Sequence, residues 1–172
     1  MKRKTPAAVT RAHIQDVEGI KVLLDDFANS GDLLARSRLS LYEHVRDFFV
    51  VKQAGRLVGC AALQVCWSDL AEVRSLAVQR DRQGHGLGRV LVEKCLQEAR
   101  ELGLHKVFAL TYRPDFFAVL GFHTVDKSEL PHKVWQDCVH CTKFPDCDEV
   151  AVMIDLQEEE SEEEEEEPPE AA

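Results

Sequence analysis

The sequence has no long hydrophobic run, and none of its apolar stretches approaches the roughly 20 residues of a membrane-spanning helix. Residues 1–6 are basic, but no apolar segment follows them as it would in a signal peptide. We therefore expect no membrane partner and a cytoplasmic location, where thiols stay reduced. The six cysteines are then free thiols or metal ligands rather than disulfides.

The chain also has no excess of basic residues. Its net charge is −10, and residues 157–172 contain ten glutamates without any lysine, arginine or aspartate. The remainder carries 21 acidic and 21 basic side chains, so it presents no net basic field for nucleic acid. A hydrophobic content of 45% excludes wholesale disorder. We predict a flexible N-terminus over 1–6, one domain over 7–156 and a disordered acidic tail over 157–172.

Hydrophobic periodicity predicts an α/β fold in which a mixed sheet carries helices on its faces. A first helix begins near Asp16 and stops at Gly31, and a capping box from Ser40 to Glu43 predicts a second, short helix. Further helices are expected over 87–102 and 114–120. Strands are expected over 7–14, 48–51, 57–65, 71–78, 105–111 and 150–156.

The most informative segment runs from Gln83 to Arg89, between a predicted strand and a predicted helix. Its glycines let backbone amides approach an anion, and the helix N-terminus adds the positive end of its dipole. Arg80, Arg82 and Arg89 surround it and favour a multiply charged phosphate. The spacing fits neither the Walker motif nor the dinucleotide fingerprint. The alternative is a tight turn that binds nothing.

Gln83-Gly84-His85-Gly86-Leu87-Gly88 matches the Q/R-x-x-G-x-G/A motif of the GCN5-related N-acetyltransferase (GNAT) family. Residues 76–78 resemble that family's fourth strand, and residues 117–122 its late aromatic-x-x-x-Gly-Phe segment. The resemblance implies the GNAT fold, with a mixed, mostly antiparallel sheet flanked by helices, and acetyl-CoA as the acetyl donor. It implies that acetyl-CoA is bound by Leu76, Ala77, Val78, Gly84, His85, Gly86, Leu87, Gly88 and Arg89.

Within this family, the chain resembles the acetyltransferase domain of N-acetylglutamate synthases over residues 31–39, 60–63, 72–78 and 107–111. That resemblance implies acetylation of the α-amine of an amino acid, with L-glutamate favoured, as the first step of arginine biosynthesis. The chain has no amino-acid-kinase domain, so feedback control by arginine through such a domain does not carry over.

Acetyl transfer to an amine needs a base for the amine proton, and the resemblance gives this role to Glu72. The alternative is a solvent-facing glutamate in an alternating strand. An acid for the departing thiolate is dispensable, because a thiolate is already a fair leaving group. Phe117 stands where many family members place a tyrosine. Thr111 and its neighbour Tyr112 are the candidates, although Thr111 could equally bond only to backbone.

Arg36 and Arg38 lie between the first two helices, where family members often build the acceptor site, and arginine pairs bidentately with carboxylates. The alternative is that both are solvated surface charges. Cys138, Cys141 and Cys147, with His132 or His140, have a spacing that allows a structural zinc, reduced packed thiols being the alternative. The other cysteines, Cys60, Cys66 and Cys95, are expected in the core.

Two other functions stay open from the sequence. The same fold could acetylate a protein N-terminus or another small amine. It could also be a non-catalytic binding module that responds to acetyl-CoA, with the acidic tail serving a partner. An intact Glu72 argues against the module. The oligomeric state is open, a homodimer being one option.

Overall fold

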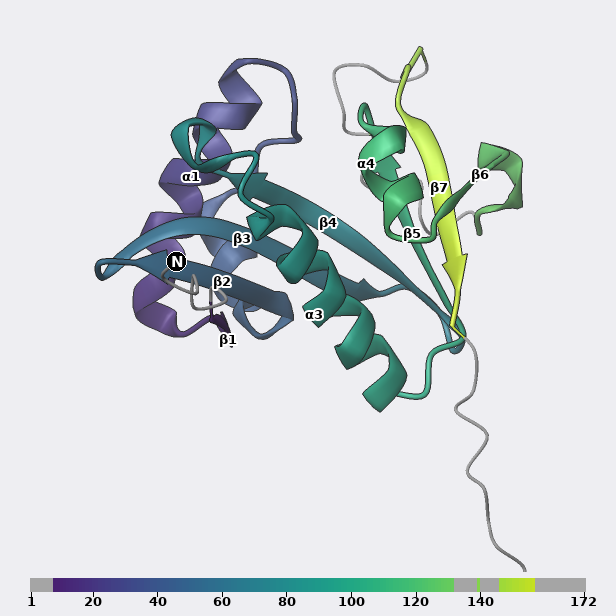
Figure 1. Ribbon diagram of the computed structural model, residues 1–172, viewed down its shortest axis with the longest axis horizontal. Helices are drawn as coiled ribbons and strands as arrows, with labels where there is room; N and C mark the ends of the chain where they lie inside the picture. Colours follow the sequence, from purple (N-terminus) through teal and green to yellow (C-terminus); the bar gives the residue numbers. More distant parts are fainter. Residues whose placement is uncertain (1–7, 132–138, 140–145, 157–172) are drawn as a thin grey trace, which may run out of the picture.

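The computed structural model describes residues 8–131, 139 and 146–156, and a seven-stranded sheet forms its centre (Figure 1). The strand order is β1-β2-β3-β4-β5-β7-β6. The strands are β1 Val9–Arg11, β2 Phe48–Gln53, β3 Arg56–Val65, β4 Leu70–Val78, β5 Lys106–Thr111, β6 His123–Val125 and β7 Val150–Asp155. The helices are α1 Val17–Asn29, α2 Arg38–Glu43, α3 Leu87–Glu101 and α4 Pro114–Val119. Short 3-10 turns cover Ile14–Asp16, Val45–Asp47, Arg80–Arg82 and Lys127–Glu129.

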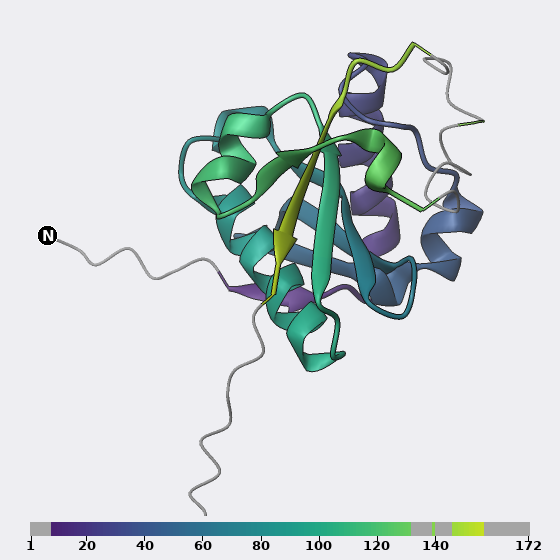
Figure 2. The same cartoon turned by 90° about the vertical axis from the view of Figure 1, so that its right-hand side faces the viewer.

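The pairing of the strands confirms the mixed, mostly antiparallel sheet. Neighbouring strands run antiparallel except for β4 and β5, which are parallel. The exception follows from the connection, because α3 lies between β4 and β5 in the chain and returns it to the same end of the sheet. β7 then enters antiparallel to β5 and separates it from β6, as Figure 2 shows.

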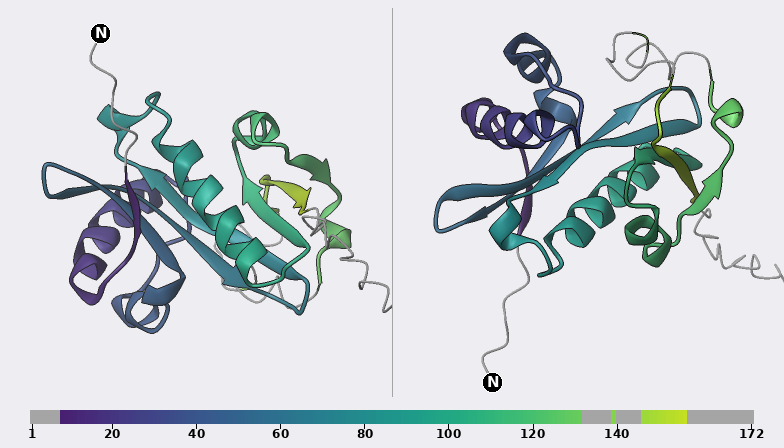
Figure 3. Two further views of the ribbon diagram at one scale, coloured as in Figure 1. Left: turned by 60° about the horizontal axis from the view of Figure 1, so that its bottom comes forward. Right: turned by 90° about the horizontal axis from the view of Figure 1, so that it is seen from above.

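Helices cover both faces of the sheet. α1 and α2 lie on one face, and α3 lies on the other (Figure 3). The buried apolar residues accordingly form separate clusters. The α3 core includes Val73, Leu91 and Phe117, the α1–α2 core includes Ile20, Leu41 and Ala62, and a smaller β5–β7 cluster includes Leu70, Phe108 and Leu130. Among the residues that the structure describes, no helix has the length and apolar character to cross a bilayer.

Three local predictions need correction. The second helix begins at Arg38, not at the predicted capping box of Ser40, because Ser37 supplies the cap and its Oγ accepts the Ser40 N–H at 3.1 Å. The first strand covers only Val9–Arg11, the part that pairs with β2. The edge strand β6 was not predicted, since three residues without clear alternation carry little signal.

Candidate active site

β4 and β5 lie together only at their first residues. Leu70 to Glu72 pair with Lys106 to Phe108, and no pairing joins the later parts of these two described strands. Figure 1 shows the two ribbons diverging from that point. In the described strands, the edge of β4 from Val73 to Val78 is therefore not paired with β5. Such an edge can receive main-chain hydrogen bonds from an extended ligand that carries amide groups.

A bulge interrupts β4 along this open edge. The register with β3 shifts between Cys60 and Ala62, so that one extra residue is accommodated in β4. Ser75 in this stretch has a φ of 53°, a left-handed angle that is uncommon for a residue other than glycine. The Cys60 thiol donates to the Ser75 carbonyl at 3.5 Å. Strained backbone of this kind gathers at functional sites, here directly before Leu76.

The glycine loop leads from the end of β4 into α3. Gly84 and Gly86 have φ angles of 75° and 80°, and Gly86 is the N-cap of α3. A Cβ at either position would meet no atom within 4 Å, so backbone angle, not crowding, requires glycine there. The Val90 N–H donates back to the Gly86 carbonyl at 3.2 Å, while the N–H groups of the preceding first turn point out of the helix. The first turn of α3 holds no acidic residue.

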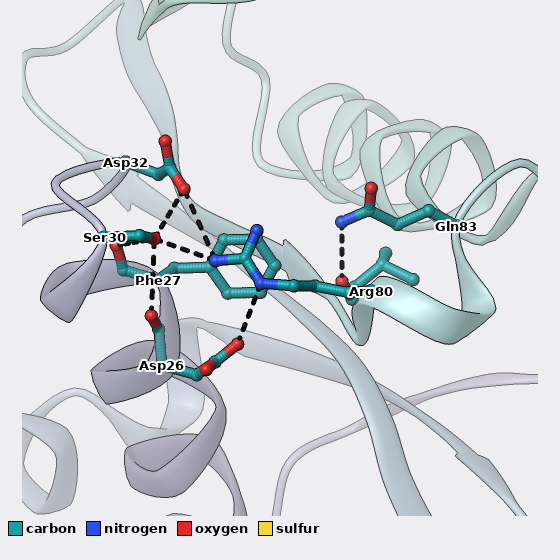
Figure 4. Close-up of polar contacts among 7 residues, drawn as sticks. Asp26, Phe27, Ser30, Asp32, Arg80 and Gln83 are labelled. Atoms are coloured by element: carbon teal, nitrogen blue, oxygen red, sulfur yellow. Dashed lines mark hydrogen bonds and ion pairs between the residues drawn. The ribbon is translucent and has the colours of Figure 1, made fainter.

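Arg80 anchors this loop to the end of α1 (Figure 4). Its Nε donates to Asp26 Oδ2 at 3.3 Å, its Nη2 donates to Ser30 Oγ at 2.8 Å, and Asp32 Oδ2 lies 3.5 Å from Nη2. Its guanidinium carbon lies 4.5 Å from the centre of the Phe27 ring. These contacts tie Arg80 to α1, and the phosphate contact that the sequence suggests for it stays a prediction.

The other two arginines of the loop are held more loosely. Arg82 pairs with Asp81 at 3.6 Å and Arg89 with Glu93 at 2.7 Å, and all four side chains are at least half exposed. Exposed ion pairs contribute only about 0–1 kcal/mol, so either arginine can exchange its carboxylate for an anion at the loop.

Glu72 and Arg74 form a charged pair in the middle of the sheet. Arg74 Nη1 lies 3.9 Å from Glu72 Oε2, and their side chains are only 10% and 17% exposed. Glu72 is therefore not the solvent-facing glutamate that strand alternation alone allowed. Charges this deep are costly, which makes the pair a functional candidate. Arg74 was not predicted from the sequence. The pattern that could have indicated it is a glutamate and an arginine two residues apart within a largely apolar strand.

Thr111 and Tyr112 lie at the far end of β5. The Thr111 side chain is buried, and its Oγ1 accepts the Arg113 N–H at 2.8 Å. This is the local backbone bond that the sequence allowed, and it leaves the hydroxyl proton able to donate elsewhere. Tyr112 is half-buried. Phe117 packs edge-on against Phe116 and Phe122, at 5.1 and 5.0 Å between ring centres, as a core residue.

The two candidate acceptor arginines differ in their surroundings. Arg36 is half-buried, directly before the cap residue of α2. Arg38 is exposed, and its Nε donates to both Glu18 oxygens at 3.0 and 3.2 Å. The bond to Glu18 raises the pKa of Arg38 above its usual value. Arg36 is the less exposed of the two, and its contact with an acceptor stays a prediction.

The predicted cysteine cluster falls largely outside the described residues, which include only Cys147 of its three cysteines. In the described ranges, no group of His, Cys, Asp and Glu residues could hold a metal ion, so the zinc prediction gains no support. Cys60 and Cys95 are buried as expected, and burial raises the pKa of each thiol to about 12. Cys66 is only half-buried.

The glycine loop leads into the N-terminus of α3, and Glu72 lies on the strand before that loop, as the GNAT resemblance implied. Residues 20–124 match the model of the acetyltransferase (GNAT) family. The chain belongs to this family. GNAT proteins are acetyltransferases, so the enzyme class expected from the glycine loop is confirmed.

Two proteins of known sequence are similar to most of this chain. The chain is 41% identical over 132 residues to the amino-acid acetyltransferase of Mycobacterium tuberculosis, with 75% of each chain covered. It is 39% identical over 151 residues to an uncharacterized N-acetyltransferase of Chlorobaculum tepidum, which covers 86% of this chain and 97% of that protein.

Two solved structures share the GNAT fold with this chain. Rv2747 of Mycobacterium tuberculosis, in complex with CoA, matches with a TM-score of 0.75 and 34% identity over 87% of this chain and 99% of that one. N-acetylglutamate synthase of Neisseria gonorrhoeae, complexed with coenzyme A and N-acetyl-glutamate, matches with a TM-score of 0.82 and 29% identity. The match covers 91% of this chain but only 36% of the gonococcal one, so this chain corresponds to about a third of it.

Proposed function

We propose that this GNAT enzyme transfers the acetyl group of acetyl-CoA to the α-amine of L-glutamate. The observation that carries the proposal is the Glu72 carboxylate at the parting of β4 and β5, on the strand that leads into the glycine loop. Relatives named amino-acid acetyltransferase and an N-acetylglutamate synthase of the same fold support the choice of acceptor.

The loop and the open edge of β4 bind the donor in this proposal. The backbone N–H groups in the first turn of α3 bind its pyrophosphate. Arg82 and Arg89, whose ion pairs are exposed, also contact the pyrophosphate. Residues 76–78 offer main-chain groups to its pantetheine arm. In this proposal, Arg80 does not contact the charged groups of the ligand. It holds the loop against α1 so that the amides converge.

Glu72 accepts the proton of the acceptor amine as the amine nitrogen attacks the thioester carbonyl. A nitrogen–carbon bond forms, the carbon–sulfur bond breaks, and CoA leaves with the electron pair as a thiolate. Thr111 or Tyr112 can then donate a hydroxyl proton to that sulfur. Arg36 would pair with the side-chain carboxylate of glutamate.

The wider setting is part of the proposal. Acetylated glutamate would serve as the first intermediate of arginine biosynthesis, in the cytoplasm, with residues 7–156 as the catalytic domain. The four cysteines that the structure describes are free thiols, which agrees with a reducing compartment.

A thiol-release assay with a panel of acceptors tests the proposal. L-Glutamate should give saturable release of CoA and a product heavier by one acetyl group, with L-glutamine, L-aspartate and L-ornithine slower. A peptide with a free N-terminus and a simple primary amine represent the other open function. If they are acetylated while glutamate gives no release above background, the glutamate assignment is wrong.

A further inference from the structure

Glu72 and Arg74 share one face of β4, and that face is the α1–α2 side of the sheet. Arg74 stands opposite Ala62 of β3, which belongs to the α1–α2 core. Glu72 stands between Gln64 of β3 and Phe108 of β5. Phe108 belongs to the β5–β7 cluster. The two charges therefore lie on a polar seam between two apolar clusters.

The residues on either side of Glu72 confirm this orientation. Ala71 and Val73 point to the opposite face and join the α3 core. Alternation thus places Leu70, Glu72 and Arg74 together, with Leu70 in the β5–β7 cluster. Neither charge has moved to solvent, since both side chains are at most 17% exposed.

The distance within the pair matters as much as its burial. Arg74 Nη1 and Glu72 Oε2 are 3.9 Å apart, beyond the 2.7–2.9 Å typical of a charge-assisted hydrogen bond. The contact between the two groups is an ion pair at the long end of the range, with the carboxylate and the guanidinium side by side on one strand face. A small ligand that carries an amine beside a carboxylate would match a carboxylate beside a guanidinium, each group facing its opposite.

We infer that Arg74 binds the α-carboxylate of the acceptor, and that the acceptor is therefore a free α-amino acid. The inference rests on the proposed function and deepens it. In an α-amino acid, the amine and the carboxylate sit on one carbon, as close together as Glu72 and Arg74 are on one strand face. A protein N-terminus offers an amide at that position, and a simple amine offers nothing. Arg36 then remains for the side-chain carboxylate.

The test compares two acceptors that differ only at the α-carboxylate. L-Isoglutamine is the α-amide of glutamate and keeps both its α-amine and its side-chain carboxylate. The wild-type enzyme should prefer glutamate. Arg74→Ala should raise the KM for glutamate by about 10- to 150-fold, the loss of one charge-assisted pair, and change that for isoglutamine by less than about threefold. The preference for the free acid should disappear.

Two further variants keep the test decisive. Arg74→Lys keeps the charge but loses the bidentate fork, so it should restore part of the preference, and it serves if Arg74→Ala does not fold. Arg56→Ala removes an exposed arginine from neighbouring β3 and should leave both KM values unchanged. Calorimetry with acetyl-CoA should show the same affinity for all variants.

The outcomes separate this inference from the glutamate assignment. If both acceptors lose activity equally in Arg74→Ala, the arginine acts on Glu72 or on folding, and the inference is wrong. If the wild-type enzyme ignores glutamate but acetylates another free amino acid, the glutamate assignment fails, and the same comparison runs with that amino acid and its amide. If it acetylates only peptides or simple amines, the inference is overturned as well.

Discussion

Glu72 stands opposite Phe108 in the parallel pairing of β4 with β5, and this pair is the last of the three that join the two strands. Phe108 is fully buried, so the strand position opposite Glu72 is apolar. Beyond this pair the two strands separate, and β4 continues toward the glycine loop paired with β3 on its other side. Glu72 is thus held by the closed part of the sheet at the point where the open part begins.

Gly86→Asp should abolish acetyl-CoA binding. The substitution places a negative side chain at the N-cap of α3, where the account puts the pyrophosphate. The space there is open, and the folded state should lose only about 1–2 kcal/mol for the left-handed backbone. Calorimetry measures the affinity and thermal unfolding measures the stability.

Gly55→Asp is the matched control for this substitution. Gly55 has a similar φ of 74° and equally open surroundings, but it lies in the turn between β2 and β3. It should lose the same stability and keep its acetyl-CoA affinity. If the two variants bind acetyl-CoA with equal affinity, the glycine loop is not the pyrophosphate site.

Replacing Asp26 and Asp32 together with asparagine should weaken acetyl-CoA binding. If Arg80 positions the loop, the loss of its carboxylate partners loosens the amides and lowers the affinity. If Arg80 instead contacts a phosphate, its release from the aspartates should raise the affinity. The sign of the change in a titration with acetyl-CoA decides between the two roles.

The stability of the protein should fall as the pH rises above 9, because of its buried thiols. Burial raises the pKa of Cys60 and Cys95 from 9.0 to about 12. Between these values the unfolded chain loses protons that the folded chain keeps. The stabilisation is complete below about pH 9, and each thiol should remove about 1.4 kcal/mol per pH unit above it.

Cys95→Ala isolates this contribution from the other groups that titrate at high pH. Urea unfolding at pH 9 and pH 10 should show a smaller pH dependence for the variant than for the wild-type protein, by about 1 kcal/mol, because half of the unfolded thiols are already ionised at pH 9. An identical pH dependence of the two proteins would contradict the raised pKa of Cys95.

Truncation after Leu156 should leave the melting temperature unchanged. The sequence predicts that residues 157–172 add nothing to the core. Truncation one residue earlier should lower the free energy of unfolding by about 1.5–3 kcal/mol. It removes the buried Leu156 side chain and the hydrogen bond that the Leu156 N–H donates to the His105 carbonyl at 2.7 Å. A large loss from the first truncation would show that the acidic segment supports the domain.

Local signals in the sequence predicted the parts of the site that are local in space. The glycine loop and the strand before it depend on neighbouring residues, and both lie where the pattern placed them. Ser37 was missed in favour of Ser40 because either hydroxyl fits a cap by composition. The contacts of Arg80 with α1 could not be predicted, because its partners Asp26 and Ser30 lie 54 and 50 residues away in the sequence. The burial of Arg74 likewise depends on packing against distant strands.

The turnover number of Glu72→Gln with L-glutamate tests the central claim most directly. The amide keeps the shape of the side chain but cannot accept the amine proton. The account predicts that the turnover number falls by about 10²- to 10⁴-fold, with the acetyl-CoA affinity by calorimetry unchanged. A folded variant that turns over at the wild-type rate would contradict the account, because the base would then lie elsewhere.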